Sequence, residues 1–298
     1  MTVLAGRRRA EALPPAPFVV GVGRSGTTLL RLMLDAHPQL AIPAETHFVP
    51  ELLERRRECR DSGELVDVIV SARSWNDFGL DAAELRAAAA GAAGAADVLR
   101  VFYGLCARSR GKSRWGDKTP GYVKRMRPIA AALEEARFVH LIRDGRDVAL
   151  SRRARGMGTE KPIAEVADLW TRRIENARRQ AKRLRGRYLE LRFEDLVADP
   201  EPALRRVCEL IELEFEPAML RHEEAAGERI SELGDLAAEG GRRARESGER
   251  QAAHALAAQA PRQARTEVWR TEMDAAERAE FEAVAGGLLA ELGYDLPS

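Results

Sequence analysis

The chain has 298 residues, of which 45% are hydrophobic, and its 48 basic residues nearly balance its 47 acidic ones, giving a formal net charge of +1. This length is enough for one α/β domain with a full hydrophobic core. The balanced charge gives no global reason to bind nucleic acid or an anionic membrane. Any anion-binding site must therefore be local, and nucleic acid is not expected as a partner.

The first 16 residues contain three successive arginines but no apolar stretch after them, so they form neither a signal peptide nor a membrane span. We expect a mobile tail over residues 1–16 and a single domain over residues 17–298. The cysteines are odd in number, widely spaced and without a metal-ligand pattern: Cys59, Cys106 and Cys208. This usage is typical of a reduced cytoplasmic protein and predicts no metal site.

The stretch from Pro17 to Leu30 is predicted to form an apolar strand, a glycine-punctuated turn and a helix. Its glycines let the backbone wrap closely around an anion, and N–H groups at the helix N-terminus are donors for phosphate oxygens. The spacing Gly21-x4-Gly26-Thr27-Thr28 resembles the phosphate loop of nucleotide-binding enzymes, but Thr27 stands where an NTPase has its lysine. Because that lysine contacts the β- and γ-phosphates, hydrolysis of ATP or GTP is the weaker interpretation.

Helical composition dominates the next part of the chain. Pro38 ends the first helix, because the residue before a proline is pushed away from helical dihedrals. A short extended piece over Leu40–Pro43 follows. Residues 50–110, rich in Ala, Leu, Glu and Arg, are predicted to form several helices that cover one side of a sheet. Residues 112–122 break this pattern and are predicted to be a loop.

Strand and helix patterns then alternate to the end of the chain. Residues 138–142 are apolar on both faces, as in a central parallel strand, and residues 187–193 alternate as a further strand. Amphipathic helices are expected over residues 163–184, 202–213 and 274–292. This order predicts an α/β fold of three layers, α/β/α, with helices on both faces of a central, mainly parallel sheet.

The segment over residues 221–265 is rich in glycine, alanine and charged residues and has weak apolar periodicity. Two interpretations stand side by side for it. It is a flexible surface segment, or it is a lid over the functional site.

Four segments in this order resemble the sulfotransferase family, closest to the branch of tyrosylprotein sulfotransferases and bacterial small-molecule sulfotransferases. They are Gly23–Thr28, Glu45–Phe48, Asp117–Pro120, and Arg143–Arg146 with Ser151. The resemblance implies a P-loop NTPase-like fold with added helices. It also implies a sulfotransferase that moves a sulfuryl group from 3′-phosphoadenosine 5′-phosphosulfate to a hydroxyl of a small molecule or peptide, without a metal. Nothing in the sequence specifies an oligomeric state.

The resemblance also implies how the nucleotide donor is held. The 5′-phosphosulfate would bind the first loop through backbone N–H groups and two threonine hydroxyls, from Ser25, Gly26, Thr27, Thr28 and Leu29. Arg24 would lie against the transferring group. Arg143 and Ser151, 151 − 143 = 8 residues apart, match the pair that grips the 3′-phosphate. The alternative role of Arg143 and Arg146 is to form surface ion pairs with Asp144 and Asp147. We expect that role for Arg146 and the phosphate-binding role for Arg143.

Sulfuryl transfer to a hydroxyl needs alignment, a base, and positive charge at the leaving phosphate oxygen. The resemblance implies Glu45 as the base; its alternative role is a carboxylate that caps the following helix, and His47 is the competing base. Lys118 matches the lysine at the bridging oxygen, where it and Arg24 would stabilise the leaving phosphate. The alternative for Lys118 is a turn with a solvated ammonium group. Lys118 and Arg143 are 143 − 118 = 25 positions apart, which leaves room for the helix and the strand that the family has between these two residues. This separation favours the functional role.

The chain departs from the family pattern in two places. Phe193 stands where relatives commonly have a tyrosine, and Glu267, close before Trp269, would repel a 3′-phosphate. One of three C-terminal arginines could restore the positive charge: Arg262, Arg265 or Arg270. The departures keep open the hypothesis of an inactive nucleotide-binding scaffold. A P-loop enzyme similar to nucleotide kinases is a further alternative from the same fold, which Thr27 disfavours.

Four aromatic residues stand near these motifs, and each has a structural and a functional interpretation: Phe48, Trp75, Trp115 and Trp170. At their spacings, aromatic side chains belong to the hydrophobic core more often than to an acceptor pocket. We therefore expect core positions for them.

Overall fold

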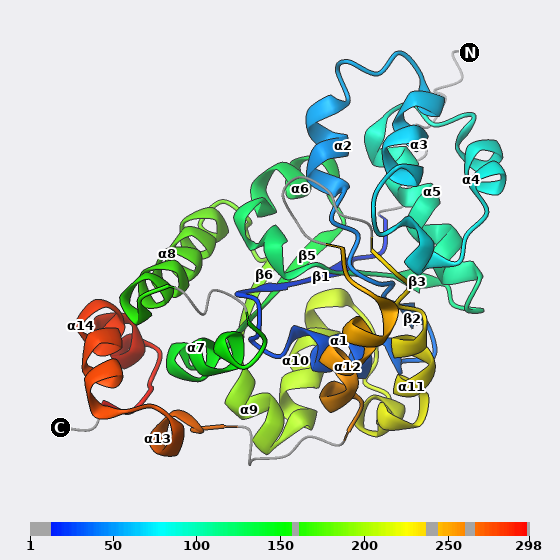
Figure 1. The fold of residues 1–298 in the computed structure, drawn as a ribbon. Helices are drawn as coiled ribbons and strands as arrows, with labels where there is room; N and C mark the ends of the chain where they lie inside the picture. Colours follow the sequence, from blue (N-terminus) through cyan, green and yellow to red (C-terminus); the bar gives the residue numbers. More distant parts are fainter. Residues whose placement is uncertain (1–12, 157–160, 237–243, 260–265, 297–298) are drawn as a thin grey trace, which may run out of the picture.

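The computed structural model describes residues 13–156, 161–236, 244–259 and 266–296 (Figure 1). Most of the predicted N-terminal tail lies outside these residues. Within them, four parallel strands form the main sheet in the order β4-β1-β5-β6. The strands are β1 (Ala16–Gly21), β4 (Asp117–Lys118), β5 (Ala136–Ile142) and β6 (Tyr188–Arg192). The prediction of a central parallel sheet is thus confirmed.

The prediction of a loop over residues 112–122 was wrong. This stretch contains β4 and also β3 (Arg114–Trp115), which pairs with β2 (Leu40–Ala41) in a second, two-stranded sheet. Strands of two residues carry no alternating pattern, so periodicity could not reveal them. As a consequence Lys118 belongs to the sheet, where it is paired with Val19 of β1.

Helices cover both faces of the sheet because successive side chains of β1 point to opposite sides. Phe18 and Val20 enter a core with the helices from α2 to α6, whereas Val19 enters a second core with α1, α9 and α10. On the first face lie α2 (Val49–Arg55), α3 (Ser62–Val70), α4 (Ala82–Ala89), α5 (Ala95–Arg108) and α6 (Met126–Ala132). On the second lie α1 (Thr27–Asp35), α9 (Phe193–Ala198) and α10 (Pro200–Ile211).

A third core joins the C-terminal part of the chain to the segment after β5. Trp170 and Trp269 are its largest buried aromatic side chains, and Phe281 is also buried there. It is formed by α7 (Gly145–Arg153), α8 (Ile163–Ala181), α13 (Trp269–Glu272) and α14 (Ala275–Glu291). Figure 1 shows α14 packed beside α8 at the side of the molecule away from α2 to α5. The helix that carries Ser151 is therefore packed against three helices that follow it in the sequence, α8, α13 and α14.

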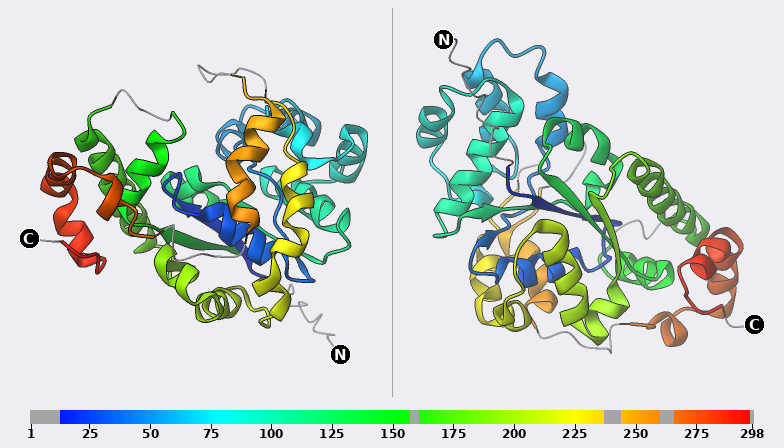
Figure 2. Two further views of the ribbon diagram at one scale, coloured as in Figure 1. Left: turned by 60° about the horizontal axis from the view of Figure 1, so that its bottom comes forward. Right: turned by 180° about the vertical axis from the view of Figure 1, so that it is seen from behind.

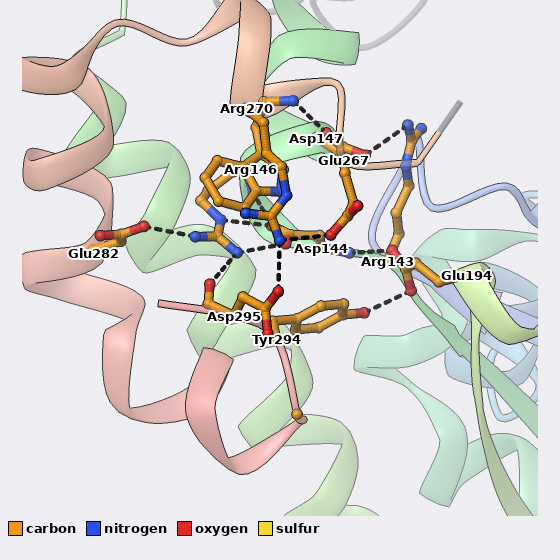
Figure 3. Close-up of polar contacts among 12 residues, drawn as sticks. Arg143, Asp144, Arg146, Asp147, Glu194, Glu267, Arg270, Glu282, Tyr294 and Asp295 are labelled. Atoms are coloured by element: carbon orange, nitrogen blue, oxygen red, sulfur yellow. Dashed lines mark hydrogen bonds and ion pairs between the residues drawn. The ribbon is translucent and has the colours of Figure 1, made fainter. Parts of the chain in front are cut away.

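Arg146 ties this third core together (Figure 3). Its guanidinium is fully buried, donates to Asp144 (2.7 Å) and to Glu282 of α14 (2.6 Å), and lies 3.5 Å from the ring centroid of Trp269. It also donates to the carbonyl of Asp295. The expected ion pair with Asp144 is present, but it is buried rather than on the surface.

The described parts of residues 221–265 are mostly helical and pack beside α1 (Figures 1 and 2). Arg250 of α12 forms a buried ion pair with Asp77, 2.5 and 2.7 Å long, and so joins this segment to η1. The elements are η1 (Trp75–Phe78), η3 (Pro217–Arg221), α11 (Glu223–Ser231), α12 (Ser247–His254) and η4 (Ala255–Ala258), where η marks a 3₁₀ helix. Whether the segment moves as a lid stays a prediction.

No helix within the described ranges is both long enough and apolar enough to cross a membrane.

Candidate active site

The predicted site residues converge because the strands are parallel and their carboxyl ends meet at one edge of the sheet. A cavity of about 970 Å³ opens at this edge. Of the ten predicted residues, eight line it: Arg24, Gly26, Thr27, Thr28, Leu29, Glu45, Arg143 and Ser151. Ser25 and Lys118 are buried directly behind this lining.

The loop after β1 has the tight geometry that its glycines predict. Gly26 has φ +89°, in the left-handed region, and a Cβ added there would lie 2.3 Å from the ring of Phe193. A Cβ at Gly21 would lie 2.6 Å from the carbonyl oxygen of Leu141 in β5. Only glycine satisfies both close approaches without displacing backbone or an aromatic ring.

The donors that this loop presents fit a phosphate group. Thr27 and Thr28 begin α1, so their backbone N–H groups have no acceptor within the helix. The Oγ of Ser25 is fully buried and has no hydrogen-bond partner. A buried hydroxyl without a partner is costly unless a ligand satisfies it. The loop therefore has the donors of an anion site, and one of them is otherwise unexplained.

The two arginines and the serine predicted around the nucleotide are joined to one another. Nε of Arg24 donates to Oγ of Ser151 (3.2 Å), and Nη1 of Arg143 donates to the backbone oxygen of Arg24 (3.4 Å). The Arg143 guanidinium also lies 4.9 Å from the ring centroid of Phe193. Arg24 was expected against the transferring group. Its side chain lies beside Ser151, and its backbone φ of +80° is unusual for a non-glycine residue. Its place against the transferring group stays a prediction.

Asp147 holds Arg143 in this position (Figure 3). Its Oδ2 accepts from Nη2 of Arg143 (3.3 Å), and its Oδ1 accepts from the backbone N–H of Trp269 (2.9 Å). Burial raises the pKa of Asp147, which Arg143 and the Trp269 N–H partly offset. The C-terminal segment thus contributes to the placement of the predicted 3′-phosphate arginine.

Glu45 and Lys118 form the centre of the site. Nζ of Lys118 lies 2.5 Å from Oε1 of Glu45, and Nε2 of His47 lies 3.3 Å from Oε2 of the same carboxylate. Burial favours the neutral form of Glu45, but Lys118 and His47 outweigh it and lower the pKa of Glu45 to about 2. The alternative role of Glu45 as a helix cap is not realised, because α2 begins at Val49 without a side-chain cap.

A buried polar network fixes the backbone on both sides of this pair. Oγ1 of Thr46 donates to Oδ2 of Asp117 (2.7 Å), which also accepts from the hydroxyl of Tyr103 (2.9 Å). The hydroxyl of Tyr122 lies 2.7 Å from the same Thr46 oxygen. Since Thr46 follows Glu45 and Asp117 precedes Lys118, the network links the two segments directly. The motifs contain Thr46 and Asp117, but their pairing could not be read from the sequence.

One functional candidate lies outside all four motifs. Nδ1 of His254, at the end of α12, lies 3.1 Å from Oγ1 of Thr28 in the phosphate loop. Residues 221–265 have weak periodicity, so the only signal in the sequence was a histidine within a segment considered as a lid.

The lining of the cavity is predominantly basic. Among the described residues, eight basic side chains line it and only four acidic ones. The basic residues beyond Arg24 and Arg143 are Arg73, Lys124, Arg152, Arg155, Arg173 and Arg245. The cavity therefore suits an anionic ligand, although the whole chain is nearly neutral.

Arg270 and the four aromatic residues considered above are not among the residues that line the cavity. Arg270 donates to Glu267 (2.7 Å) and to Asp295 (2.6 Å) and is not among the cavity-lining residues. Arg262 and Arg265 lie outside the described residues. Trp170 and Phe48 are buried in the core, while Trp75 and Trp115 pack against it, as expected.

The sequence predicted no metal site and no role for the cysteines beyond that of reduced, buried side chains. Among the described residues, no group of three or more His, Cys, Asp or Glu side chains could hold a metal ion. Cys59, Cys106 and Cys208 are free thiols. Reaction without a metal and a cytoplasmic location both stay predictions.

The sequence comparison places the chain in a known family. The profile of the sulfotransferase family matches residues 15–217, and the chain belongs to this family. The part matched holds the phosphate loop, Glu45, Lys118, Arg143 and Ser151. His254 and the C-terminal helices lie beyond it.

Among curated proteins, the chain is similar to protein-tyrosine sulfotransferases. It is 28% identical to Protein-tyrosine sulfotransferase 1 of Danio rerio over 72% of this chain and 57% of that protein. It is 30% identical to Protein-tyrosine sulfotransferase 2 of Gallus gallus, over 72% of this chain and 55% of that protein. The chain therefore spans about half the length of these relatives.

Two solved structures share the fold over almost their whole length. The sulfotransferase domain from the curacin biosynthetic pathway superposes with a TM-score of 0.61 at 22% identity, over 96% of this chain and 99% of that domain. The sulfotransferase domain from the Synechococcus PCC 7002 olefin synthase gives a TM-score of 0.60 at 25% identity, over 97% and 99%. The predicted three-layer fold is confirmed.

Proposed function

We propose that this chain transfers a sulfuryl group from 3′-phosphoadenosine 5′-phosphosulfate to a hydroxyl group. The observation that carries the proposal is the contact between Lys118 and Glu45, which places a cation and a carboxylate together beside a phosphate loop that has no lysine of its own. An NTPase would need that cation within the loop. Here it is supplied from β4, a separate strand.

Two groups of residues would hold the donor. The first is the loop from Ser25 to Leu29, whose N–H groups and buried Ser25 hydroxyl would bind the 5′-phosphosulfate. The second is the pair of Arg143 and Ser151, which would bind the 3′-phosphate by a charged fork and a hydroxyl. When bound, the nucleotide supplies an activated sulfuryl group on a phosphate leaving group.

The chain's own residues would do three things during transfer. Glu45 would take the proton of the acceptor hydroxyl as its oxygen forms a bond to sulfur. Lys118 and Arg24 would stabilise the negative charge that develops on the phosphate oxygen as its bond to sulfur breaks. In this structure Lys118 contacts Glu45, and Arg24 contacts Ser151. Both cations would therefore have to leave these partners to contact an anionic donor.

The acceptor would be a small molecule or a peptide that carries a hydroxyl. Support for a peptide comes from the names of the relatives, which are protein-tyrosine sulfotransferases. Support for a small molecule comes from the two domains of similar fold, which are named for biosynthetic pathways or synthases.

The donor can be tested by calorimetric titration with three nucleotides: adenosine 3′,5′-bisphosphate, ADP and ATP. We expect the bisphosphate to bind at least about 10-fold more tightly than ADP, because one charged hydrogen bond contributes about 1.5–3 kcal/mol. Tight ATP binding with no preference for a 3′-phosphate would contradict the proposal and favour the kinase-like alternative.

Turnover then separates an enzyme from a scaffold. The protein is incubated with sulfur-labelled donor, with and without a mixture of phenols, alcohols and tyrosine peptides. We expect labelled acceptor, or slow release of labelled sulfate without one. Tight binding of adenosine 3′,5′-bisphosphate with neither product would support the inactive scaffold.

A further inference from the structure

The contact between His254 and Thr28 brings residues 247–258 to the phosphate loop. His254 is the last residue of α12, lines the cavity, and is 226 positions from Thr28 in sequence. It lies outside the part of the chain that the family profile matches. The contact is therefore a feature of this chain's C-terminal segment rather than of the shared motifs.

The position of His254 is fixed by the packing of its helix. Four residues earlier, Arg250 forms the buried ion pair with Asp77 and also donates to the carbonyl of Gly234. After the helix, the carbonyl of Ala257 in η4 lies 3.1 Å from Nε2 of the buried His222. These contacts hold both ends of the segment, so the imidazole is directed at the loop by buried structure and not by a free surface chain.

The His254 ring is neutral at physiological pH. Burial is the main cause that lowers its pKa, to about 3, and the nearby cations Lys118, Arg31 and Arg24 lower it further, against the opposing charge of Glu45. A neutral imidazole has one N–H donor and one acceptor nitrogen. The tautomer therefore decides whether Nδ1, which faces Thr28, is a hydrogen-bond donor or an acceptor.

The Thr28 hydroxyl has one hydrogen to donate, and an anion in the loop needs it. If that hydrogen points at Nδ1, it is lost to the anion. If instead Nδ1 carries the proton and donates to Oγ1, the Thr28 hydrogen is free to point at the anion. Only the second arrangement lets the Thr28 hydroxyl donate to a bound phosphate or sulfate.

We propose that His254 is a positioning residue for the donor: its Nδ1–H donates to Oγ1 of Thr28 and directs the Thr28 hydroxyl hydrogen to the 5′-phosphosulfate. This inference rests on the proposed donor. Through the side chain of His254, residues 247–258 would contribute to nucleotide binding.

The test compares two variants by titration with adenosine 3′,5′-bisphosphate, with thermal unfolding as the control for folding. His254→Ala removes the hydrogen bond, and we expect affinity to fall about 2- to 10-fold, the usual range for one neutral hydrogen bond. His254→Asn places an amide N–H where Nδ1–H was, and we expect it to restore most of the affinity. Gln251→Ala is the matched control on the same helix, because Gln251 contacts the carbonyl of Leu233 and does not line the cavity.

Coupling to Thr28 provides the sharper measurement. In a Thr28→Val background the hydroxyl is absent, so we expect His254→Ala to change affinity by less than 2-fold. Nitrogen-15 spectra of the histidine ring should show the Nδ1–H tautomer when adenosine 3′,5′-bisphosphate is bound.

Three results would overturn the inference. An undiminished effect of His254→Ala in the Thr28→Val protein would show that the ring acts elsewhere. Lost turnover with unchanged nucleotide affinity would assign His254 to the acceptor instead. If the wild-type protein fails to bind adenosine 3′,5′-bisphosphate, the proposed donor and this inference fail together, whereas binding without coupling rejects this inference alone.

Discussion

Nζ of Lys118 lies 2.5 Å from Oε1 of Glu45, so the predicted cation and the predicted base neutralise each other in this structure. The pair has a chemical consequence. A carboxylate with a pKa of about 2 is a weak base, and it becomes a stronger one when Lys118 turns to another anion. An arriving donor would thus recruit the lysine and activate the glutamate in the same event.

Glu45→Gln is expected to reduce turnover at least about 100-fold, because general-base catalysis contributes on the order of 10²–10⁴. Affinity for adenosine 3′,5′-bisphosphate should change by less than about 3-fold, since the amide keeps the shape of the side chain. Single-turnover kinetics with labelled donor provide the rate, and calorimetry the affinity. His47→Gln is the control for the competing base: if it reduces turnover more than Glu45→Gln does, the assignment of Glu45 is wrong.

Arg143→Ala should remove most of the preference for adenosine 3′,5′-bisphosphate over ADP, by about 10- to 100-fold, because a charged hydrogen bond to the 3′-phosphate is lost. The preference is the ratio of two dissociation constants, so a general loss of binding does not imitate it. Arg270→Ala serves as control, since Arg270 is paired with Glu267 and Asp295 outside the cavity. If only Arg270→Ala changes this preference, the 3′-phosphate binds at the C-terminal segment and not at Arg143.

Gly26→Ala is expected to destabilise the fold by about 1–3 kcal/mol and to abolish measurable nucleotide binding, because φ of +89° and the ring of Phe193 both exclude a Cβ. Gly23→Ala is a matched control in the same loop, where an added Cβ meets no atom within 4 Å. Urea unfolding and calorimetry measure the two effects. Equal losses in both variants would show that loop flexibility, and not the close approach to Phe193, is decisive.

Asp117 should make stability depend on pH in a defined window. Burial raises its pKa from 3.8 to about 6, so between these values the folded protein binds more protons than the unfolded chain. The free energy of unfolding should therefore fall as pH rises through this window, by up to about 3 kcal/mol. Glu45 acts in the opposite sense and at lower pH, from 4.5 towards about 2.

The measurement is urea unfolding of wild type and Asp117→Asn at pH 4.5, 5.5 and 6.5, chosen around that window. The variant cannot ionise, so we expect its stability to lose the fall between the first and last values. Asp168→Asn on α8 provides a comparison at a different, ion-paired aspartate. A slope that survives in Asp117→Asn would place the titration on another group.

The order of the long strands and helices followed from the sequence, because long apolar strands and amphipathic helices carry a strong periodic signal. The grouping of the four motifs into one site was implied by the resemblance to the sulfotransferase family. The two-residue strand that holds Lys118 did not follow from the sequence, since its place depends on pairing with β1. The positions of three side chains also depend on tertiary contacts that the sequence does not reveal. Arg24 lies beside Ser151, Arg146 is buried, and His254 reaches the phosphate loop from a segment with almost no pattern.

Arg146 joins the part of the chain that the family profile matches to the residues that follow it. The family profile ends at residue 217, yet the buried guanidinium needs Glu282 and the backbone of Asp295 from beyond it. A shortened protein that stops at residue 217 would keep all four motifs but lose the Trp269 ring, the Glu282 carboxylate and the Asp295 carbonyl that contact this guanidinium. It would also expose the face of α8 that Phe281 covers. The last helix is thus a structural part of the nucleotide site, through the helix on which Ser151 stands.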